Sequence, residues 1–127
     1  MLTRDEQDTI RRGVIAALAA ISEADHDGPI GMFKEGRAAT RALKELPEPL
    51  RTAVLSDATS PDVADDPADS LEGDLHAALD VVRTRTPEFS GAFCSVVYTA
   101  CSAVAAASHG VSPRERAALD RVRAVLR

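Results

Sequence analysis

Apolar residues recur at helical spacing over the first part of the chain. They lie three, four or seven residues apart, as expected for one face of a helix: Ile10, Val14, Ile15, Leu18 and Ile21. Thr3 and Glu6 precede them with the spacing of a capping box, in which each side chain binds a free amide at a helix start. The pattern predicts a first helix over residues 4–23, and the acidic stretch that follows ends it.

The next apolar stretch predicts a second helix over residues 32–45. Its inward face would include Phe33, Ala39 and Leu43, with Met32 as a further candidate. Pro47 and Pro49 cannot continue the hydrogen-bond ladder, so they end this helix. Pro49 suits the first turn of a short third helix.

Three further helical segments are expected in the second half. Residues 56–69 are rich in Asp, Pro and Ser and predict the main loop. Ser70 is then expected to cap a helix, and Thr86 with Pro87 to open a long uncharged helix ending at Gly110. The last helix follows the capping box Ser112–Glu115, SPRE.

The composition agrees with an all-helical protein. The 127 residues are 45% apolar but only 3% aromatic, so the core must consist mainly of Ala, Leu, Val and Ile. No strand pattern competes with the helical periods. The sequence therefore predicts an all-α fold: a single domain over residues 1–127, forming a compact bundle of about six or seven helices.

Charge limits the partners that can be expected. The formal charge is −5, which argues against nucleic acid, because binding to a phosphate backbone needs many uncompensated cations. The N-terminus is charged where a secretory signal would be apolar, so we expect a cytoplasmic protein. The uncharged stretch Phe89–Ser108 is rich in Ala, Ser and Thr, which favours a buried central helix over a transmembrane segment.

The sequence does not favour an enzyme. Cys94 and Cys101 are seven residues apart on one predicted helix, roughly 10 Å at a rise of 1.5 Å per residue, too far for a disulfide bond. Their apolar neighbours indicate structural thiols rather than nucleophiles. The chain has no glycine-rich phosphate loop and no nucleophile-elbow motif. His76 has no second His or Cys three or four residues away on the helix face, as a zinc-binding helix would, and is interpreted as a surface or boundary residue.

The last helix carries many arginines, which could form a patch for an acidic partner or for a membrane surface. Glu115 and Asp120 interleave with them, which is typical of a solvated face. The arginines are Arg114, Arg116, Arg121, Arg123 and Arg127.

Residues 23–35, EADHDGPIGMFKE, have part of the spacing of a calcium loop. With Gly28 at the sharp turn of such a loop, Glu23, Asp25 and Asp27 fall on the alternating oxygen-ligand positions, and Ile30 falls on the aliphatic position.

The match then breaks, because Lys34 occupies the position of the bidentate glutamate and Glu35 follows one residue later. Three interpretations stay open: an intact calcium site, an altered divalent-cation site, and a solvated turn ended by Gly28. The aspartates of segment 56–69 could complete a cation site, although acidic runs are usually solvated.

The two ends of the chain resemble each other. If Gly28 is aligned with Gly110, each follows an Ala-rich helix and precedes an aliphatic residue and then a glutamate. Beyond those glutamates, Ala38 and Ala42 align with Ala118 and Val122. Two related helix-loop-helix hairpins are therefore predicted.

These hairpins resemble the TerB-like family of tellurite-resistance proteins. The resemblance lies in SAVAAASHGVSPRERAALDRVRAVL, residues 102–126, and in AALAAISEADHDGPIGMFKEGRAATRAL, residues 16–43. It implies an all-helical bundle with two related halves and a metal ion in the acidic loops. The loop residues it implies are Asp27, Gly28, Ile30 and Glu35 in the first hairpin, and His109, Gly110, Val111 and Glu115 in the second.

Both loops depart from the family pattern. The first is one residue long before its glutamate, whereas the second is one residue short and has His109 where the family has an acid. Imidazole suits zinc or nickel better than calcium.

Together, these features predict a non-catalytic accessory or stress-response module. Its divalent cation, calcium or zinc, would be held by Glu23, Asp25, Asp27 and Glu35. The alternative is a metal-independent protein-interaction module, of adaptor or immunity type, that binds protein partners through its acidic surface. A bundle that binds a small molecule is a third alternative.

Overall fold

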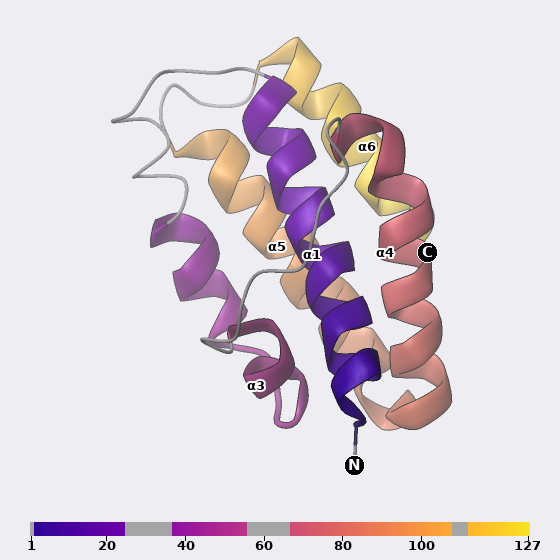
Figure 1. Cartoon of the computed structure of the whole chain (residues 1–127). Helices are drawn as coiled ribbons and strands as arrows, with labels where there is room; N and C mark the ends of the chain where they lie inside the picture. The colour runs from indigo at the N-terminus through magenta and orange to yellow at the C-terminus, as the bar shows by residue number, and fades with distance from the viewer. Residues whose placement is uncertain (1, 25–36, 56–66, 108–111) are drawn as a thin grey trace.

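The computed structural model describes residues 2–24, 37–55, 67–107 and 112–127, and every regular element among them is helical (Figure 1). The prediction of an all-helical bundle is confirmed. The elements are α1 (Arg4–Ala24), helical residues 37–43, α3 (Leu50–Leu55), α4 (Pro67–Arg85), the 3-10 helix η1 (Pro87–Phe89), α5 (Ser90–Ala106) and α6 (Pro113–Leu126).

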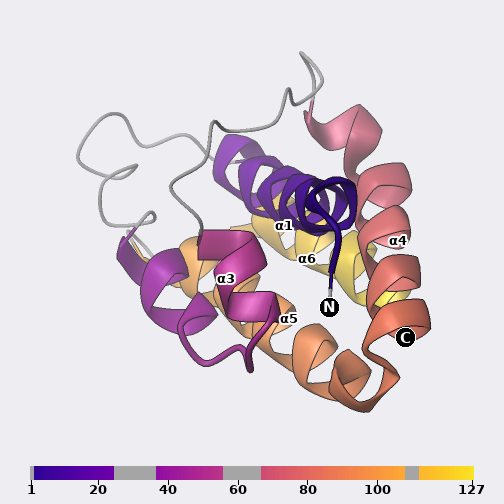
Figure 2. The ribbon, with the colours of Figure 1, turned by 60° about the horizontal axis from the view of Figure 1, so that its bottom comes forward.

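Helix α1 lies at the centre of the bundle. It packs against α3, α4, α5 and α6, with its longest contact along α4 (Figure 2). Its residues Ile10, Val14 and Ile21 are fully buried. The central position was predicted for the uncharged helix α5, and that prediction is wrong. One face of α5 is buried in the bundle. Residues of its other face, such as Ser95 and Thr99, are exposed.

The uncharged stretch is long and apolar enough to cross a membrane. Pro87–Ala106 meets that condition by length and composition only, and 33% of its most apolar window is buried inside the bundle. Phe93, Val97 and Cys101 of this stretch have no exposed surface and face the other helices. Its packing is that of a helix of the bundle.

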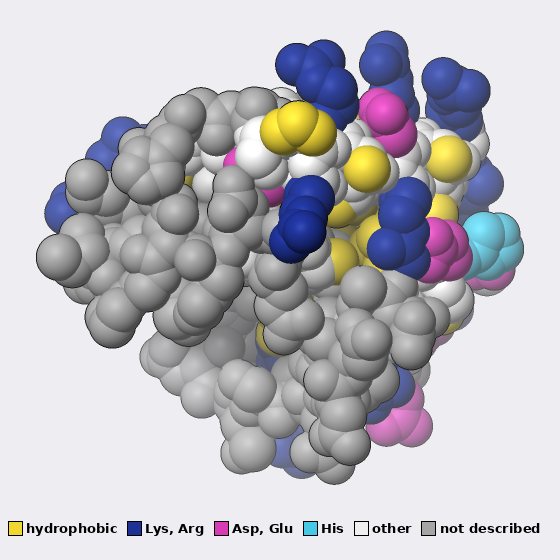
Figure 3. All heavy atoms as spheres, turned by 90° about the horizontal axis from the view of Figure 1, so that it is seen from above, with side chains coloured by type: hydrophobic (Ala, Val, Ile, Leu, Met, Phe, Trp, Pro, Cys, Tyr) yellow, Lys and Arg dark blue, Asp and Glu magenta, His cyan; other side chains and the backbone are white. Residues whose placement is uncertain are grey.

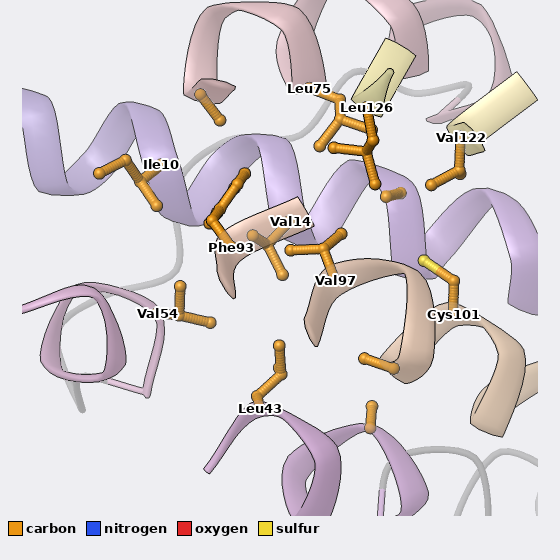
Figure 4. Close-up of a cluster of buried hydrophobic side chains, with 14 of the residues drawn as sticks. Ile10, Val14, Leu43, Val54, Leu75, Phe93, Val97, Cys101, Val122 and Leu126 are labelled. Atoms are coloured by element: carbon orange, nitrogen blue, oxygen red, sulfur yellow. The ribbon is translucent and has the colours of Figure 1, made fainter. Parts of the chain in front are cut away.

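The core consists mainly of aliphatic side chains, as the composition predicts. Side chains from α1, residues 37–43, α3, α4, α5 and α6 converge in one cluster (Figure 4). Phe93 is the largest fully buried side chain. Around it lie Ile10, Val14, Leu43, Val54, Leu75, Val97, Cys101, Val122 and Leu126.

Both predicted capping boxes are confirmed. The Glu6 amide donates to Thr3 Oγ1 at 3.1 Å, and the Thr3 amide donates to Glu6 Oε1 at 2.8 Å. At the start of α6, the Glu115 amide donates to Ser112 Oγ at 3.1 Å, and the Ser112 amide donates to Glu115 Oε1 at 3.0 Å. These local signals correctly locate the first residues of α1 and α6.

Two other predicted helix starts are corrected. Ser70 lies inside α4, which begins three residues earlier at Pro67, a residue whose fixed φ suits a first helical turn. Thr86 precedes η1 but makes no side-chain cap. Its hydroxyl donates instead to the Val82 carbonyl at 3.1 Å, so Thr86 closes the end of α4.

The predicted repeat needs a shift of one residue in its second helix. Ala39 and Leu43 are buried as expected, whereas Ala38 and Ala42 are half-buried. Their supposed equivalents Ala118 and Val122 are buried in α6. The buried pair therefore lies one position later in residues 37–43 than the alignment of Glu35 with Glu115 implies. Phe33 and Met32, predicted on the same inward face, lie outside the described residues.

Candidate functional site

The predicted cation ligands fall almost entirely outside the described residues. Asp25, Asp27 and Glu35 belong to segment 25–36, and Glu23 lies in the last turn of α1, where only its backbone is described. The helices on both sides of the segment are described: α1 ends at Ala24, and residues 37–43 are helical. A helix–connection–helix arrangement is thus present at the predicted place.

The end of α1 has an unusual charge for a helix C-terminus. Its last turn contains no basic side chain, while Glu23 lies in that turn and Asp25 and Asp27 follow it. The partial negative charge of a helix C-terminus disfavours each nearby anion by about 0.3–1 kcal/mol. A bound cation would offset this repulsion.

The second loop implied by the TerB-like resemblance can be examined only at its glutamate. His109, Gly110 and Val111 are outside the described residues, but Glu115 is described. Glu115 is 4% exposed as a whole residue, and its carboxylate accepts the Ser112 amide in the capping box. Glu115 therefore has a structural use at the start of α6.

Titratable side chains in the described ranges are dispersed. No group of three His, Cys, Asp or Glu residues within those ranges could hold a metal ion. The exposed His76 faces Asp80 one turn later on α4, with Nδ1 3.3 Å from Oδ2. Arg11 is buried and pairs with Asp8 at 2.7 Å. His76 is thus a surface residue, as the sequence indicates.

The two cysteines lie on the buried side of α5. Burial raises the pKa of the Cys101 thiol to about 12, and Cys101 packs near Val122 in the core (Figure 4). Partial burial also raises the pKa of the half-buried Cys94. Neither environment favours the thiolate, so both positions fit the predicted structural role.

The outer side of α6 carries a concentration of positive charge that the sequence analysis interpreted differently. Arg114, Arg116 and Arg123 are exposed, as is Arg127 next to the helix end. Several Lys and Arg side chains stand out in the view from above, with acidic side chains among them (Figure 3). Because Glu115 is buried, Asp120 is the only exposed acidic residue of α6.

Two of the α6 arginines contact neighbouring helices. Arg121 binds Glu72 of α4 through two hydrogen bonds, Nε–Oε1 at 2.6 Å and Nη2–Oε2 at 2.7 Å. The Arg123 guanidinium lies 5.9 Å from the ring centroid of Tyr98 on α5. Tyr98 is half-buried beside α6.

The signal for this arrangement was present in the sequence. In a capping box, the glutamate side chain turns back toward the start of the helix. The SPRE pattern therefore predicts that the Glu115 side chain does not lie among the arginines on the exposed face of α6. The Tyr98–Arg123 contact joins two helices and has no comparable local signal.

Comparison with protein-family models, curated proteins and solved structures finds no match to this chain. The TerB-like resemblance therefore stays a prediction from the sequence.

Proposed function

We propose that this protein is a non-catalytic accessory module, of the kind the TerB-like resemblance implies, that holds a divalent cation at residues 23–35. The observation that supports the proposal is the position of the two flanking helices. Because α1 ends at Ala24 and residues 37–43 are helical, the acidic stretch with calcium-loop spacing connects two helices. Connections of this kind hold calcium in helix–loop–helix proteins.

Electrostatics at the end of α1 also support a cation. Glu23, Asp25 and Asp27 follow one another at a helix C-terminus whose last turn has no basic residue. A divalent ion would be attracted both by the carboxylates and by the free carbonyl groups of the last helical turn.

Because of the position of α1, a cation bound at its end would affect the stability of the other helices. Since α1 packs against α3, α4, α5 and α6, an ion bound at its end would stabilise the helix on which the bundle is assembled. A ligand that binds only the folded state raises stability by about 2.7 kcal/mol at a hundredfold excess over its Kd.

The test is the thermal midpoint of chelator-stripped protein during titration with calcium and then with zinc. We expect a saturable rise for one of the two ions and no rise in the Asp25→Ala/Asp27→Ala variant. The Glu45→Ala/Glu88→Ala variant loses the same charge at two exposed positions outside both acidic segments and should keep the response. An unchanged midpoint up to millimolar ion, or equal responses of both variants, would overturn the proposal.

A second candidate function is binding of a basic protein partner without metal. It is favoured by the distribution of charge along the chain. Segments 25–36 and 56–66 contain seven of the 20 acidic residues and only one of the 15 Lys and Arg residues. Salt-sensitive binding of a Lys-rich peptide in the presence of chelator, lost in the Asp25→Ala/Asp27→Ala variant or in an Asp57→Ala/Asp62→Ala variant, would support this candidate.

A further inference from the structure

The outer surface of α6 has the properties of a docking surface for negatively charged groups. We use the term α6 arginine surface for Arg114, Arg116, Arg121, Arg123 and Arg127. The opposite face of α6 is fixed in the core, because Ala118, Leu119, Val122 and Leu126 are buried. The arginines are therefore displayed from a helix that cannot rotate without exposing the core.

Most of these arginines lack a carboxylate partner within the described chain. Arg114, Arg116, Arg123 and Arg127 form no ion pair with any residue that the structure describes. Glu115 forms no ion pair with them, and its buried side chain accepts the Ser112 amide instead. Asp120 is the one exposed acid on α6. The surface thus has a clear excess of positive charge.

The arginines are arranged in two rows along α6. Arg116 and Arg123 are seven residues apart, about 10.5 Å along the axis, and so lie on the same side of the helix. Arg114 and Arg121 have the same spacing on the other side. The exposed positions between the two sides hold Pro113, Ala117 and Ala124, which are small, and the single carboxylate Asp120. A narrow extended or helical segment could therefore approach closely between the arginines.

We propose that the α6 arginine surface binds an acidic segment of a partner protein. The chain itself shows the type of contact, because Arg121 already holds Glu72 of a neighbouring helix through both carboxylate oxygens. Guanidinium groups match carboxylates in this forked geometry. The proposal is independent of the cation site, which lies in another part of the chain.

Two other anionic surfaces fit less well. Insertion into a lipid surface uses large apolar side chains next to the basic ones, whereas the exposed apolar residues of α6 are only Pro and Ala. Binding to a nucleic acid draws on many Lys and Arg side chains over a large basic area, whereas the α6 arginine surface is confined to one helix. An acidic polypeptide needs neither a deep apolar anchor nor a large basic area.

The experiment measures binding of a short fluorescein-labelled oligoglutamate peptide by fluorescence anisotropy, in low-salt buffer and then at about 0.15 M salt. The variant Arg116→Gln/Arg123→Gln is compared with Arg4→Gln/Arg41→Gln. All four arginines are exposed, and both variants lose the same charge, so a difference between them reports position rather than net charge. Circular dichroism confirms that both variants are folded.

We expect the Arg116→Gln/Arg123→Gln variant to bind the peptide about fivefold or more weakly, and the control to bind nearly as tightly as the wild type. Tyr98 gives a second, local readout: it is the only tyrosine, the chain has no tryptophan, and Arg123 lies over its ring. Its emission should change on binding an unlabelled peptide.

Three outcomes would overturn the proposal. The first is an equal loss of affinity in both variants, and the second is the absence of peptide binding at low salt. The third is tighter α6-dependent binding to phosphatidylserine vesicles or to a single-stranded oligonucleotide than to the peptide.

Discussion

At the scale of single residues, glutamates of this chain have distinct structural uses. Glu6 and Glu115 accept amides at the starts of α1 and α6. The hydrogen bond from the Thr3 backbone amide is the main cause that lowers the pKa of Glu6. Glu72 instead joins two helices, because its carboxylate accepts both hydrogen bonds from Arg121, and this interaction lowers its pKa below 4.5.

The Glu72–Arg121 pair predicts a pH-dependent contribution to stability. A carboxyl whose pKa is lowered by folding stabilises the protein above its unfolded pKa, and this stabilisation is lost as the pH falls through the folded value. We expect Glu72→Gln to reduce the free energy of unfolding at pH 7 by at most about 1 kcal/mol, since the pair is partly exposed to solvent. The difference from the wild type should shrink as the pH falls below the unfolded-state pKa and through the lowered folded pKa of Glu72.

Urea unfolding across this pH range measures the effect. Glu45→Gln is a suitable control, because Glu45 is exposed and forms no ion pair within the described part of the chain. A Glu72→Gln effect that is constant from neutral to acidic pH would show that the carboxylate charge is not its cause.

Residue-level features were predictable where they depend on near neighbours in the sequence. Both capping boxes and the burial of Cys101 follow from residues a few positions away. Tyr98 and Glu72 could not be interpreted in that way, because their partners Arg123 and Arg121 come from α6. The candidate cation ligands Glu23, Asp25, Asp27 and Glu35 stay a prediction, since their side chains lie outside the described residues.

At the scale of elements, helices α1 and α4 approach each other closely at Gly13. A Cβ atom at Gly13 would lie 2.5 Å from the Ala78 Cβ and 2.6 Å from the Asp74 carbonyl oxygen. The Asp74 oxygen belongs to the backbone and cannot move aside by rotation of a side chain. The two helices can therefore pack at this distance only because residue 13 has no side chain.

The crossing predicts opposite effects for two glycine substitutions. Gly13→Ala should lower the free energy of unfolding by about 1–3 kcal/mol, because the added methyl group forces α1 and α4 apart. Gly73→Ala should raise it by about 0.5–1 kcal/mol, because a Cβ at this exposed helical position meets no atom within 4 Å and alanine favours the helix. Thermal or urea unfolding of both variants provides the comparison.

Equal effects of the two substitutions would contradict the close crossing and would point to helix propensity alone. The apolar period located α1 to within a residue, yet it gave no indication of Gly13. Periodicity shows which face of a helix is buried, but the distance to the partner helix depends on residues that come together only in the folded chain.

At the scale of the whole molecule, charge and packing are distributed unevenly. Outside segments 25–36 and 56–66, the chain has a net charge of +1, although the total is −5. The basic character of α6 therefore could not be predicted from the net charge of the whole chain. The central position of α1 could not be predicted from apolar content either, because α5 is more apolar than α1. Which helix becomes central depends on how extensively the neighbouring helices pack against it.

The packing of α1 predicts where the chain is most resistant to local opening. Residues 10–21 of α1 face α3, α4, α5 and α6, so exposing their amides requires most of the bundle to separate. We expect these amides to exchange with deuterium only through global unfolding. The six-residue helix α3 contacts α1 but is short, and its amides should exchange earlier. Exchange followed by mass spectrometry of peptic fragments measures both.

Ile10→Val tests whether α1 belongs to one cooperative unit with α4 and α5. Removing one methylene group from this fully buried side chain should destabilise the protein by about 0.5–1.5 kcal/mol. If these helices unfold together, the slowest amides of α1, α4 and α5 should all lose protection by the same free energy. A loss confined to α1, or exchange of α1 as fast as that of α3, would show that the central helix opens separately. An ion bound at the end of α1 could then stabilise that helix without stabilising the whole bundle.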